Sequence, residues 1–186
     1  MHFSTKMKKN LFQNIEIPEN IELTIEGSEI IVKGPIGENK RAFNFGKLEI
    51  KKDANKIVIG SKKATKREKK YMNTIAAHLR NMIKGAGKKF EYELKVCFSH
   101  FPMSVELKNN EAIIKNFLGE KIPRKMKLPE GVEVKANKDI ITISSSDKEL
   151  AGQVATNFEK ITRAKGRDLR VFQDGIYIIK KPGREI

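Results

Sequence analysis

The sequence predicts an α+β fold built from two tandem copies of a small antiparallel sheet with one packed helix. Two observations lead to this prediction. The same pair of apolar hairpin patterns occurs twice, and each pair is followed by one helical pattern that opens on a capping motif. A helix with a single apolar stripe covers one face of a sheet, so each copy is expected to have two layers.

The first hairpin of each copy consists of two alternating apolar strands that lead to Gly-Glu. Residues 21–38 read IELTIEGSEIIVKGPIGE and residues 105–120 read VELKNNEAIIKNFLGE, which places Gly37 and Gly119 82 positions apart. Alternation of apolar and polar residues is typical of a strand with one buried face. These two segments therefore predict equivalent hairpins.

The second hairpin follows at nearly the same spacing. LEIKKDANKIVI at residues 48–59 matches VEVKANKDIITI at residues 132–143, an offset of 84. Short polar segments interrupt both patterns, so turns are expected at residues 53–55 and 137–139.

A helical pattern closes each copy. Thr65 is followed by Glu68, and Ser146 by Glu149; this is the capping box, in which a hydroxyl and a carboxylate satisfy backbone N–H groups at a helix start. The apolar residues that follow recur with a period of 3.6. The predicted buried face contains Tyr71, Met72, Ile75, Leu79, Met82 and Ile83 in the first helix, and Leu150, Val154, Phe158 and Ile161 in the second.

These patterns divide the chain into three expected segments. Residues 1–88 form the first sheet-plus-helix repeat, residues 89–162 the second, and residues 163–186 a basic C-terminal hairpin and tail. Residues 1–10 are a candidate disordered extension. The alternative is one α+β domain with accidental internal similarity, which the two matching hairpins and two matching caps disfavour.

The composition indicates a globular and strongly basic chain. Lys and Arg number 38 against 23 Asp and Glu, so the 186 residues carry a formal net charge of +15. Such a surplus favours a polyanionic partner, either nucleic acid or an acidic membrane surface. No apolar run approaches the ~18 residues of a membrane span, and no signal peptide is expected. Cys97 is the only cysteine, which excludes an intrachain disulfide and favours an intracellular setting.

Few residues suggest catalytic or metal chemistry. Cys97 and His100 form a lone C-x-x-H, but a structural zinc site needs four ligands, and the remaining histidines, His2 and His78, supply no second pair. KGPIGE at residues 33–38 lacks the spacing of a phosphate-binding loop. We therefore expect no enzyme activity, no cofactor, no metal and no small-molecule substrate.

The first concentration of positive charge is KKATKREKK at residues 62–70, at the start of the first predicted helix. Cations are disfavoured at a helix N-terminus, and a bound phosphate would resolve this conflict. The alternative is an ordinary lysine-rich solvated surface. The candidate RNA-binding residues here are Lys62, Lys63, Lys66 and Arg67.

The second concentration is RAKGRDLRVFQDGIYIIKK at residues 163–181. Gly166 allows a tight turn after the helix, and Asp174-Gly175 predicts a two-residue hairpin turn that would order the segment. Phe172 and Tyr177 could stack on a base, although packing against the second repeat is the favoured interpretation. The candidate RNA-binding residues here are Arg163, Lys165, Gly166, Arg167, Arg170, Lys180 and Lys181.

Four segments in order resemble a known family. VKGPIGE, NMIKGAGKKFEYELKVCFSHFPMSV, NFLGEK and RDLRVFQDGIYI, together with the twofold repeat, resemble the large-subunit ribosomal protein L-six family, in its archaeal and eukaryotic branch. The resemblance covers about residues 10–180. The bacterial branch carries Lys-Gly-Lys-Gly after its second helix, whereas residues 164–168 here read AKGRD, so this loop is expected to differ in shape.

The resemblance implies a non-enzymatic structural component of the large ribosomal subunit in the cytoplasm. It implies two small sheet-plus-helix domains that bind large-subunit ribosomal RNA, mainly through the second domain and the C-terminal region. The expected location is near the stalk base and factor-binding region, beside other ribosomal proteins of the large subunit and stalk base, and not at a membrane. Two other classes stay open: a stand-alone RNA-binding regulator or chaperone, and an RNA-processing enzyme.

Overall fold

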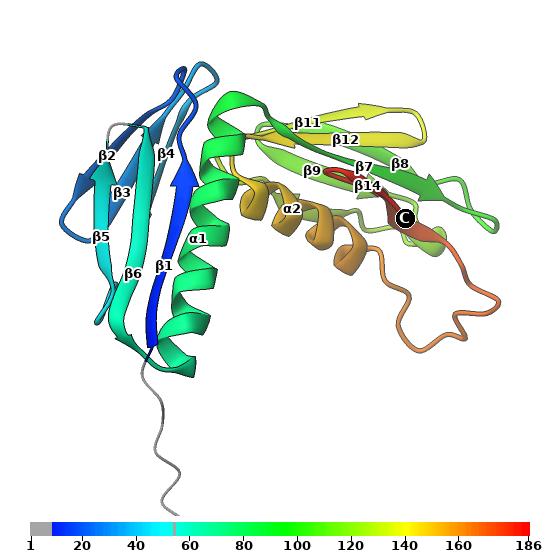
Figure 1. Ribbon diagram of the computed structural model, residues 1–186. Coiled ribbons are helices and arrows are strands. Elements are labelled where there is room, and N and C mark those ends of the chain that lie inside the picture. Colours follow the sequence, from blue (N-terminus) through cyan, green and yellow to red (C-terminus); the bar gives the residue numbers. More distant parts are fainter. Residues whose placement is uncertain (1–8, 54) are drawn as a thin grey trace, which may run out of the picture. The chain divides into compact units, whose positions relative to one another are not determined.

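The computed structural model describes residues 9–53 and 55–186, and the chain divides into two compact units, Met1–Lys88 (unit 1) and Lys89–Ile186 (unit 2) (Figure 1). The candidate extension at residues 1–10 lies almost wholly outside the described residues, as does Ala54 of the first predicted turn. Each unit combines short antiparallel strands with one long helix, so the predicted α+β class with a duplicated domain is confirmed.

Among residues 9–53 and 55–88, unit 1 contains two three-stranded antiparallel sheets and one helix. The sheet orders are β1-β6-β5 and β2-β3-β4. The elements are β1 (Lys9–Glu16), β2 (Glu22–Glu26), β3 (Glu29–Lys33), β4 (Glu38–Ala42), β5 (Glu49–Asp53), β6 (Lys56–Ala64) and α1 (Lys66–Gly87).

Unit 2 repeats this order and adds two strands at its end. Its sheets are β11-β12-β7-β13-β14 and β10-β9-β8. The elements are β7 (Phe90–Cys97), β8 (Ser104–Lys108), β9 (Glu111–Lys115), the 3₁₀ turn η1 (Phe117–Gly119), β10 (Arg124–Lys127), β11 (Val132–Asn137), β12 (Ile140–Ser145), α2 (Lys148–Ile161), β13 (Gly175–Lys181) and β14 (Arg184–Glu185).

The repeat patterns in the sequence correspond to equivalent strands. The order β1-β6-β5 matches β7-β12-β11, and β2-β3-β4 matches β8-β9-β10. Each unit therefore holds two small sheets where the sequence predicted one. Pro18 and Pro102 stand shortly before β2 and β8. Because proline cannot donate to a strand ladder, the chain leaves the first sheet there and starts a second one.

Each unit has its own apolar core, to which its helix contributes one stripe. In α1 the predicted residues are buried, except that Tyr71 at the edge of the stripe is 47% exposed and Ala76 is buried instead. In α2, Val154 and Phe158 are buried as predicted, whereas Leu150 and Ile161 are only partly buried. The small residues Ala151 and Ala155 complete the buried stripe of α2.

The two helix starts differ in detail. At α1 the predicted capping box is present: Arg67 N donates to the Thr65 hydroxyl (3.3 Å), and Thr65 N donates to the Glu68 carboxylate (2.9 Å). At α2 the prediction was one residue early, because the N-cap is Asp147, whose carboxylate accepts from Glu149 N (2.8 Å). Aspartate caps a helix as well as serine does.

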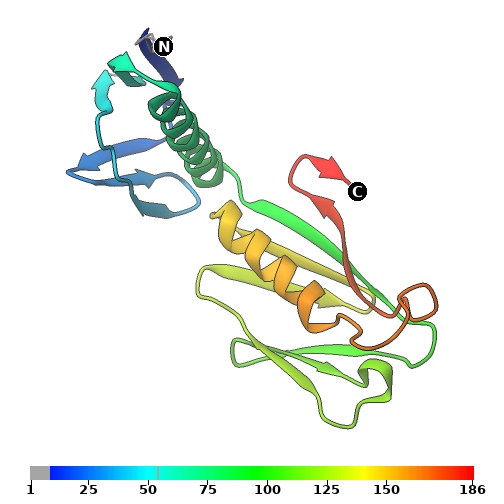
Figure 2. The same cartoon turned by 90° about the horizontal axis from the view of Figure 1, so that it is seen from below.

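The C-terminal segment is not a separate hairpin. β13 pairs antiparallel with β7 and so belongs to the five-stranded sheet of unit 2 (Figure 2). The predicted turn at Asp174-Gly175 is wrong, since β13 begins at Gly175 and the hairpin turn lies between β13 and β14, where Gly183 has φ +79°. Asp174 makes long-range hydrogen bonds instead, as described below.

One glycine of unit 1 provides a test of strand packing. A Cβ added at Gly60 in β6 would lie 2.3 Å from the carbonyl oxygen of Leu11 and 2.3 Å from the Phe12 ring. Gly60→Ala is therefore expected to cost about 1–3 kcal/mol of unfolding free energy, measured by urea denaturation. Gly37→Ala is the matched control, because its Cβ would meet nothing within 4 Å. Equal stability of the two variants would contradict this close approach.

Candidate nucleic-acid interface

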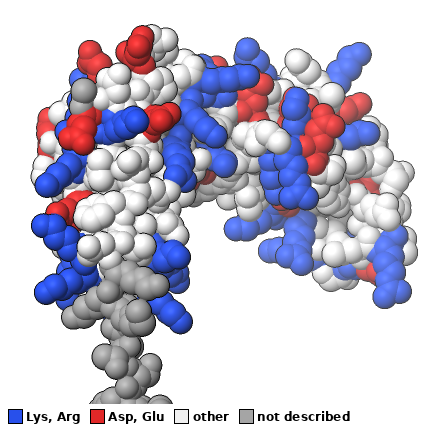
Figure 3. Space-filling view, in the orientation of Figure 1, with Lys and Arg blue, Asp and Glu red and all other residues white. Residues whose placement is uncertain are grey.

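The chain between α2 and β13 presents a cluster of positive charge on unit 2. We call residues 163–174 the basic loop; it is drawn in orange in Figure 1. Its four cationic side chains are exposed: Arg163, Lys165, Arg167 and Arg170. Figure 3 shows basic side chains along the edge of unit 2 where this loop lies. Gly166 adopts φ +67°, a left-handed conformation that favours glycine and gives the predicted tight turn.

The N-terminal end of the basic loop is anchored by Thr162, which is 2% exposed. Its hydroxyl donates to the carbonyl of Phe158 (2.9 Å) and accepts from Ile176 N (3.0 Å), which joins the end of α2 to the start of β13. One turn earlier, the Glu159 carboxylate accepts from Ile178 N (3.0 Å) at the irregular register between β13 and β7. The loop therefore leaves a fixed helix end.

The second end is anchored by Asp174, which is 3% exposed. Its carboxylate accepts from Ser99 N (2.7 Å) and His100 N (3.1 Å), and it lies 2.6 Å from His100 Nδ1. Burial raises the pKa of Asp174, but the amide hydrogen bonds from Ser99 and the side-chain and amide bonds from His100 outweigh this and lower the pKa to about 2. The carboxylate is therefore ionised at neutral pH.

Contacts within the basic loop also limit its conformations. Asp168 accepts from Arg170 N at its carboxylate (2.9 Å) and from Phe172 N at its carbonyl (2.9 Å). The Phe172 ring stacks on His100 with centroids 4.7 Å apart, and the Arg167 guanidinium carbon lies 4.6 Å from the Phe172 centroid. Phe172 thus packs against unit 2, the alternative that the sequence favoured over base stacking.

The three candidates that follow on β13 differ in their surroundings. Lys180 donates to the Glu93 carboxylate (2.6 Å) across the β13–β7 pair, and this hydrogen bond raises the pKa of Lys180. Lys181 is exposed at the end of the strand. Tyr177 is 44% exposed, and its hydroxyl donates to the carbonyl of Gln173 (3.2 Å).

Unit 1 carries a second cluster of cations, the 62–70 cluster, where β6 ends and α1 begins. Its exposed cations are Lys62, Lys63, Lys66, Arg67, Lys69 and Lys70. Figure 3 shows basic side chains gathered at this end of unit 1. The capping box already places the Glu68 carboxylate at the helix start, where hydrogen bonds from the Thr65 side chain and backbone lower the pKa of Glu68. The N-terminus of α1 therefore already has a carboxylate partner within the chain.

Comparison with known proteins agrees with the repeated architecture. The family model described as ribosomal protein L6 matches twice, over residues 17–87 and 101–175, once in each unit. Three similar proteins are each named large ribosomal subunit protein uL6. That of Methanococcus vannielii is 45% identical over 172 residues (92% of this chain, 94% of the relative). Those of Methanobrevibacter smithii and Methanothrix thermoacetophila are 43% and 41% identical, over 91% and 94% of this chain and 95% and 99% of the relatives.

The chain belongs to the ribosomal protein L6 family. Ribosomal protein L6 is a structural component of the ribosome and not an enzyme, which confirms both the resemblance and the predicted absence of catalysis. The basic loop lies within the second matched segment of the ribosomal protein L6 model, and the 62–70 cluster lies within the first.

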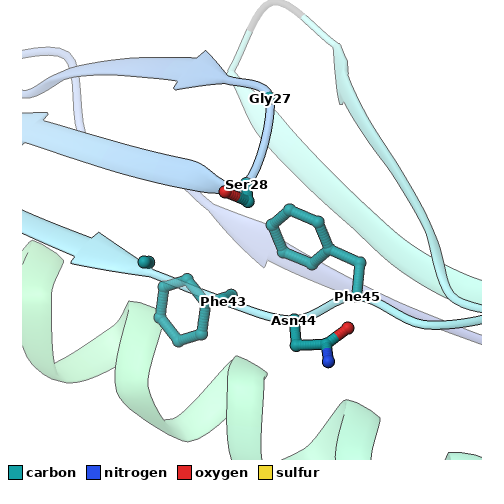
Figure 4. A pocket seen from close by; sticks show the side chains of 6 residues that line it. Gly27, Ser28, Phe43, Asn44 and Phe45 are labelled. Atoms are coloured by element: carbon teal, nitrogen blue, oxygen red, sulfur yellow. The ribbon is translucent and has the colours of Figure 1, made fainter.

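Three further properties of this ribosomal protein L6 chain bear on ligand, metal and membrane binding. A depression in unit 1 is lined by Phe43 and Phe45, whose ring centroids are 6.2 Å apart, with Gly27, Ser28, Ala42 and Asn44 around them (Figure 4). None of these described lining residues carries a charge. Within residues 9–53 and 55–186, no group of three His, Cys, Asp or Glu could hold a metal ion. Among the same residues no helix is long and apolar enough to cross a membrane.

Sequence reasoning missed the residues that support the basic loop. His100 was considered only as part of the Cys97–His100 pair, whereas its ring binds Asp174, 74 positions away. Arg124 was not considered: its guanidinium pairs with Glu120 (2.5 Å), donates to the carbonyl of Ile161 at the end of α2, and lies 4.3 Å from the Phe117 ring centroid. The contacts of His100 with Asp174 and of Arg124 with Ile161 join residues 74 and 37 positions apart, so neither has a signal in local spacing.

Proposed function

We propose that this protein is a structural constituent of the large ribosomal subunit that binds large-subunit ribosomal RNA near the stalk base and factor-binding region of cytoplasmic ribosomes. Its family and the names of its relatives support the ribosomal assignment. The observation that supports RNA binding most directly is the basic loop, in which Arg163, Lys165, Arg167 and Arg170 are exposed between two anchored ends.

The proposed mechanism is phosphate neutralisation together with recognition of folded RNA by shape. The arginine guanidinium group makes bidentate hydrogen bonds to phosphate oxygens, and an ordered loop can present several arginines to RNA at the same time. Lys180 would share its charge between RNA and Glu93, so it contributes less than Lys181. The proposed contact residues are Arg163, Lys165, Gly166, Arg167, Arg170, Lys180 and Lys181 in unit 2, and Lys62, Lys63, Lys66 and Arg67 in unit 1. Neighbouring proteins of the large subunit and stalk base are the proposed protein partners.

Sedimentation distinguishes this function from a stand-alone RNA-binding regulator or chaperone. In a sucrose gradient of cell lysate, the protein should travel with large subunits and remain there at moderate salt. A protein found mainly in the light fractions would favour the stand-alone alternative.

The salt dependence of binding tests the 62–70 cluster. Replacing Lys62, Lys63 and Lys66 with glutamine should lower the slope of log affinity against log salt by about one unit for each true phosphate contact, because each contact releases counterions. Binding of full-length protein to purified large-subunit ribosomal RNA measures this slope.

A matched triple variant controls for the loss of net charge. Lys33 and Lys40 pair with Glu38 (3.7 and 3.0 Å), and Lys56 lies 3.9 Å from Glu16, so their replacement with glutamine should leave the slope nearly unchanged. Identical slopes for wild type and the 62–70 variant would assign these lysines to bulk solvent.

A further inference from the structure

Two segments far apart in the sequence meet at one buried carboxylate in unit 2. Asp174 ends the basic loop, while Ser99 and His100 lie in the connection between β7 and β8. The Asp174 carboxylate receives one amide hydrogen bond from each of these residues and contacts the His100 ring at 2.6 Å. Because every one of these partners lies in the β7–β8 connection, the carboxylate fixes the position of the loop end relative to that connection.

The ionised state of Asp174 decides which atom donates in its hydrogen bond with the His100 ring. An ionised carboxylate only accepts hydrogen bonds, so Nδ1 of His100 carries the proton and donates to Asp174. The ring face then carries the Phe172 contact, with centroids 4.7 Å apart and planes 24° from parallel. Phe172 in turn lies beneath the Arg167 guanidinium. The orientation of His100 therefore influences the position of Phe172 and, through Phe172, that of Arg167, a proposed RNA contact.

These contacts lie outside the apolar core of unit 2. Ser99, His100, Phe172 and Asp174 are not among its core residues, which come from the strands, α2 and the residues that pack against them. The His100 side chain is 33% exposed. Loss of the hydrogen bond between the His100 ring and Asp174 should therefore loosen the basic loop without opening the sheet, because Asp174 still accepts from the amides of Ser99 and His100.

We propose that His100 and Asp174 form a positioning clamp, which holds the basic loop in the shape that presents Arg163, Arg167 and Arg170 to RNA. This proposal rests on the proposed function, because it concerns how the same loop binds. A loop that is already ordered loses less conformational entropy when it binds. The clamp thus contributes to affinity without touching RNA itself.

Two substitutions at His100 separate the hydrogen bond from the ring contact. His100→Asn keeps an N–H donor near the position of Nδ1 but removes the ring, whereas His100→Phe keeps a ring for Phe172 but removes the donor. Asp174→Asn is less informative, because the amide could donate to an unprotonated Nδ1 and restore the bond. His78→Phe makes the same chemical change as His100→Phe in unit 1 and serves as the matched control.

Limited trypsin digestion of the folded full-length protein reports on the clamp directly. Trypsin cuts after the four cations of the basic loop, so cleavage within residues 163–170, followed by mass spectrometry, measures how often the loop opens. His100→Phe should raise this cleavage rate about tenfold while leaving the thermal unfolding of unit 2 almost unchanged. His100→Asn and His78→Phe should cleave near the wild-type rate.

Affinity for purified large-subunit ribosomal RNA should follow the same order. His100→Phe should bind about three- to tenfold more weakly, with His100→Asn restoring most of the loss. Wild-type cleavage and wild-type affinity in His100→Phe would overturn the clamp. Weak RNA binding by His100→Asn, with normal binding by His100→Phe, would also overturn it, because the effect would then come from the ring contact and not from the hydrogen bond. If wild-type protein failed to bind the RNA, the proposed function would be wrong, and the trypsin comparison would still decide whether the clamp orders the loop.

Discussion

Replacing Phe158 with alanine is expected to destabilise unit 2 strongly while the stability of unit 1 is unchanged. Phe158 is 0% exposed and belongs to the core of unit 2, where α2 packs on β7, β12 and β13. Truncating a buried phenylalanine costs about 3–5 kcal/mol, from lost apolar burial and from the cavity left behind. A domain of this size has only about 5–15 kcal/mol of total stability, so this single change removes a large share of it.

Hydrogen exchange read by mass spectrometry separates the two units in this experiment. Amides of β7, β12 and α2 should lose protection in Phe158→Ala, while those of β6 and α1 should keep theirs. Leu79→Ala is the reciprocal variant, since Leu79 is 0% exposed in the core of unit 1 and should cost about 2–5 kcal/mol there. Simultaneous loss of protection in both units would show that the chain unfolds as one cooperative body.

The repeated fold could be predicted because its signals are local. A capping box places both partners within four residues, and at Thr65 and Glu68 the expected hydrogen bonds are present. The hairpin at residues 132–143 likewise turns within a few residues, with Lys138 at φ +47°. Local backbone chemistry decides such features, and one copy of the pattern supports the other.

The pairing of β13 with β7 could not be predicted in the same way. It joins residues about 80 positions apart, and no local pattern specifies which strand edge a segment will add to. Asp174-Gly175 has the composition of a tight turn, but the carboxylate of Asp174 satisfies the amides of Ser99 and His100 instead. Tertiary hydrogen bonding therefore overrode a correct local preference.

The candidate site shows the same division between local and distant effects. Charge and exposure of the cations in the basic loop follow from a polar, turn-rich sequence. The engagement of Lys180 does not: the register of β13 places it opposite Glu93, 87 positions away. Ion pairs of this kind depend on strand pairing. The sequence therefore predicts how many cations this segment carries, but not which of them form ion pairs within the protein.

Changing Arg163, Arg167 and Arg170 together to lysine should weaken binding to large-subunit ribosomal RNA while the protein remains folded. The three side chains are exposed, and the Arg170 side chain is 93% exposed with Nε 4.0 Å from the Asp168 carboxylate. Lysine keeps the charge but presents a point donor, so a bidentate phosphate contact becomes a single one. The expected loss is on the order of 1 kcal/mol for each bidentate contact that lysine replaces.

The measurement is the affinity of full-length protein for purified large-subunit ribosomal RNA at physiological salt, with thermal unfolding as the check on folding. The control is the double variant Arg41→Lys with Arg80→Lys in unit 1, which makes two changes of the same kind outside the proposed contacts. Because net charge is unchanged in both variants, the slope of log affinity against log salt should stay near its wild-type value even where affinity falls. Wild-type affinity in the triple variant would refute forked phosphate contacts and leave diffuse electrostatic attraction as the function of the basic loop.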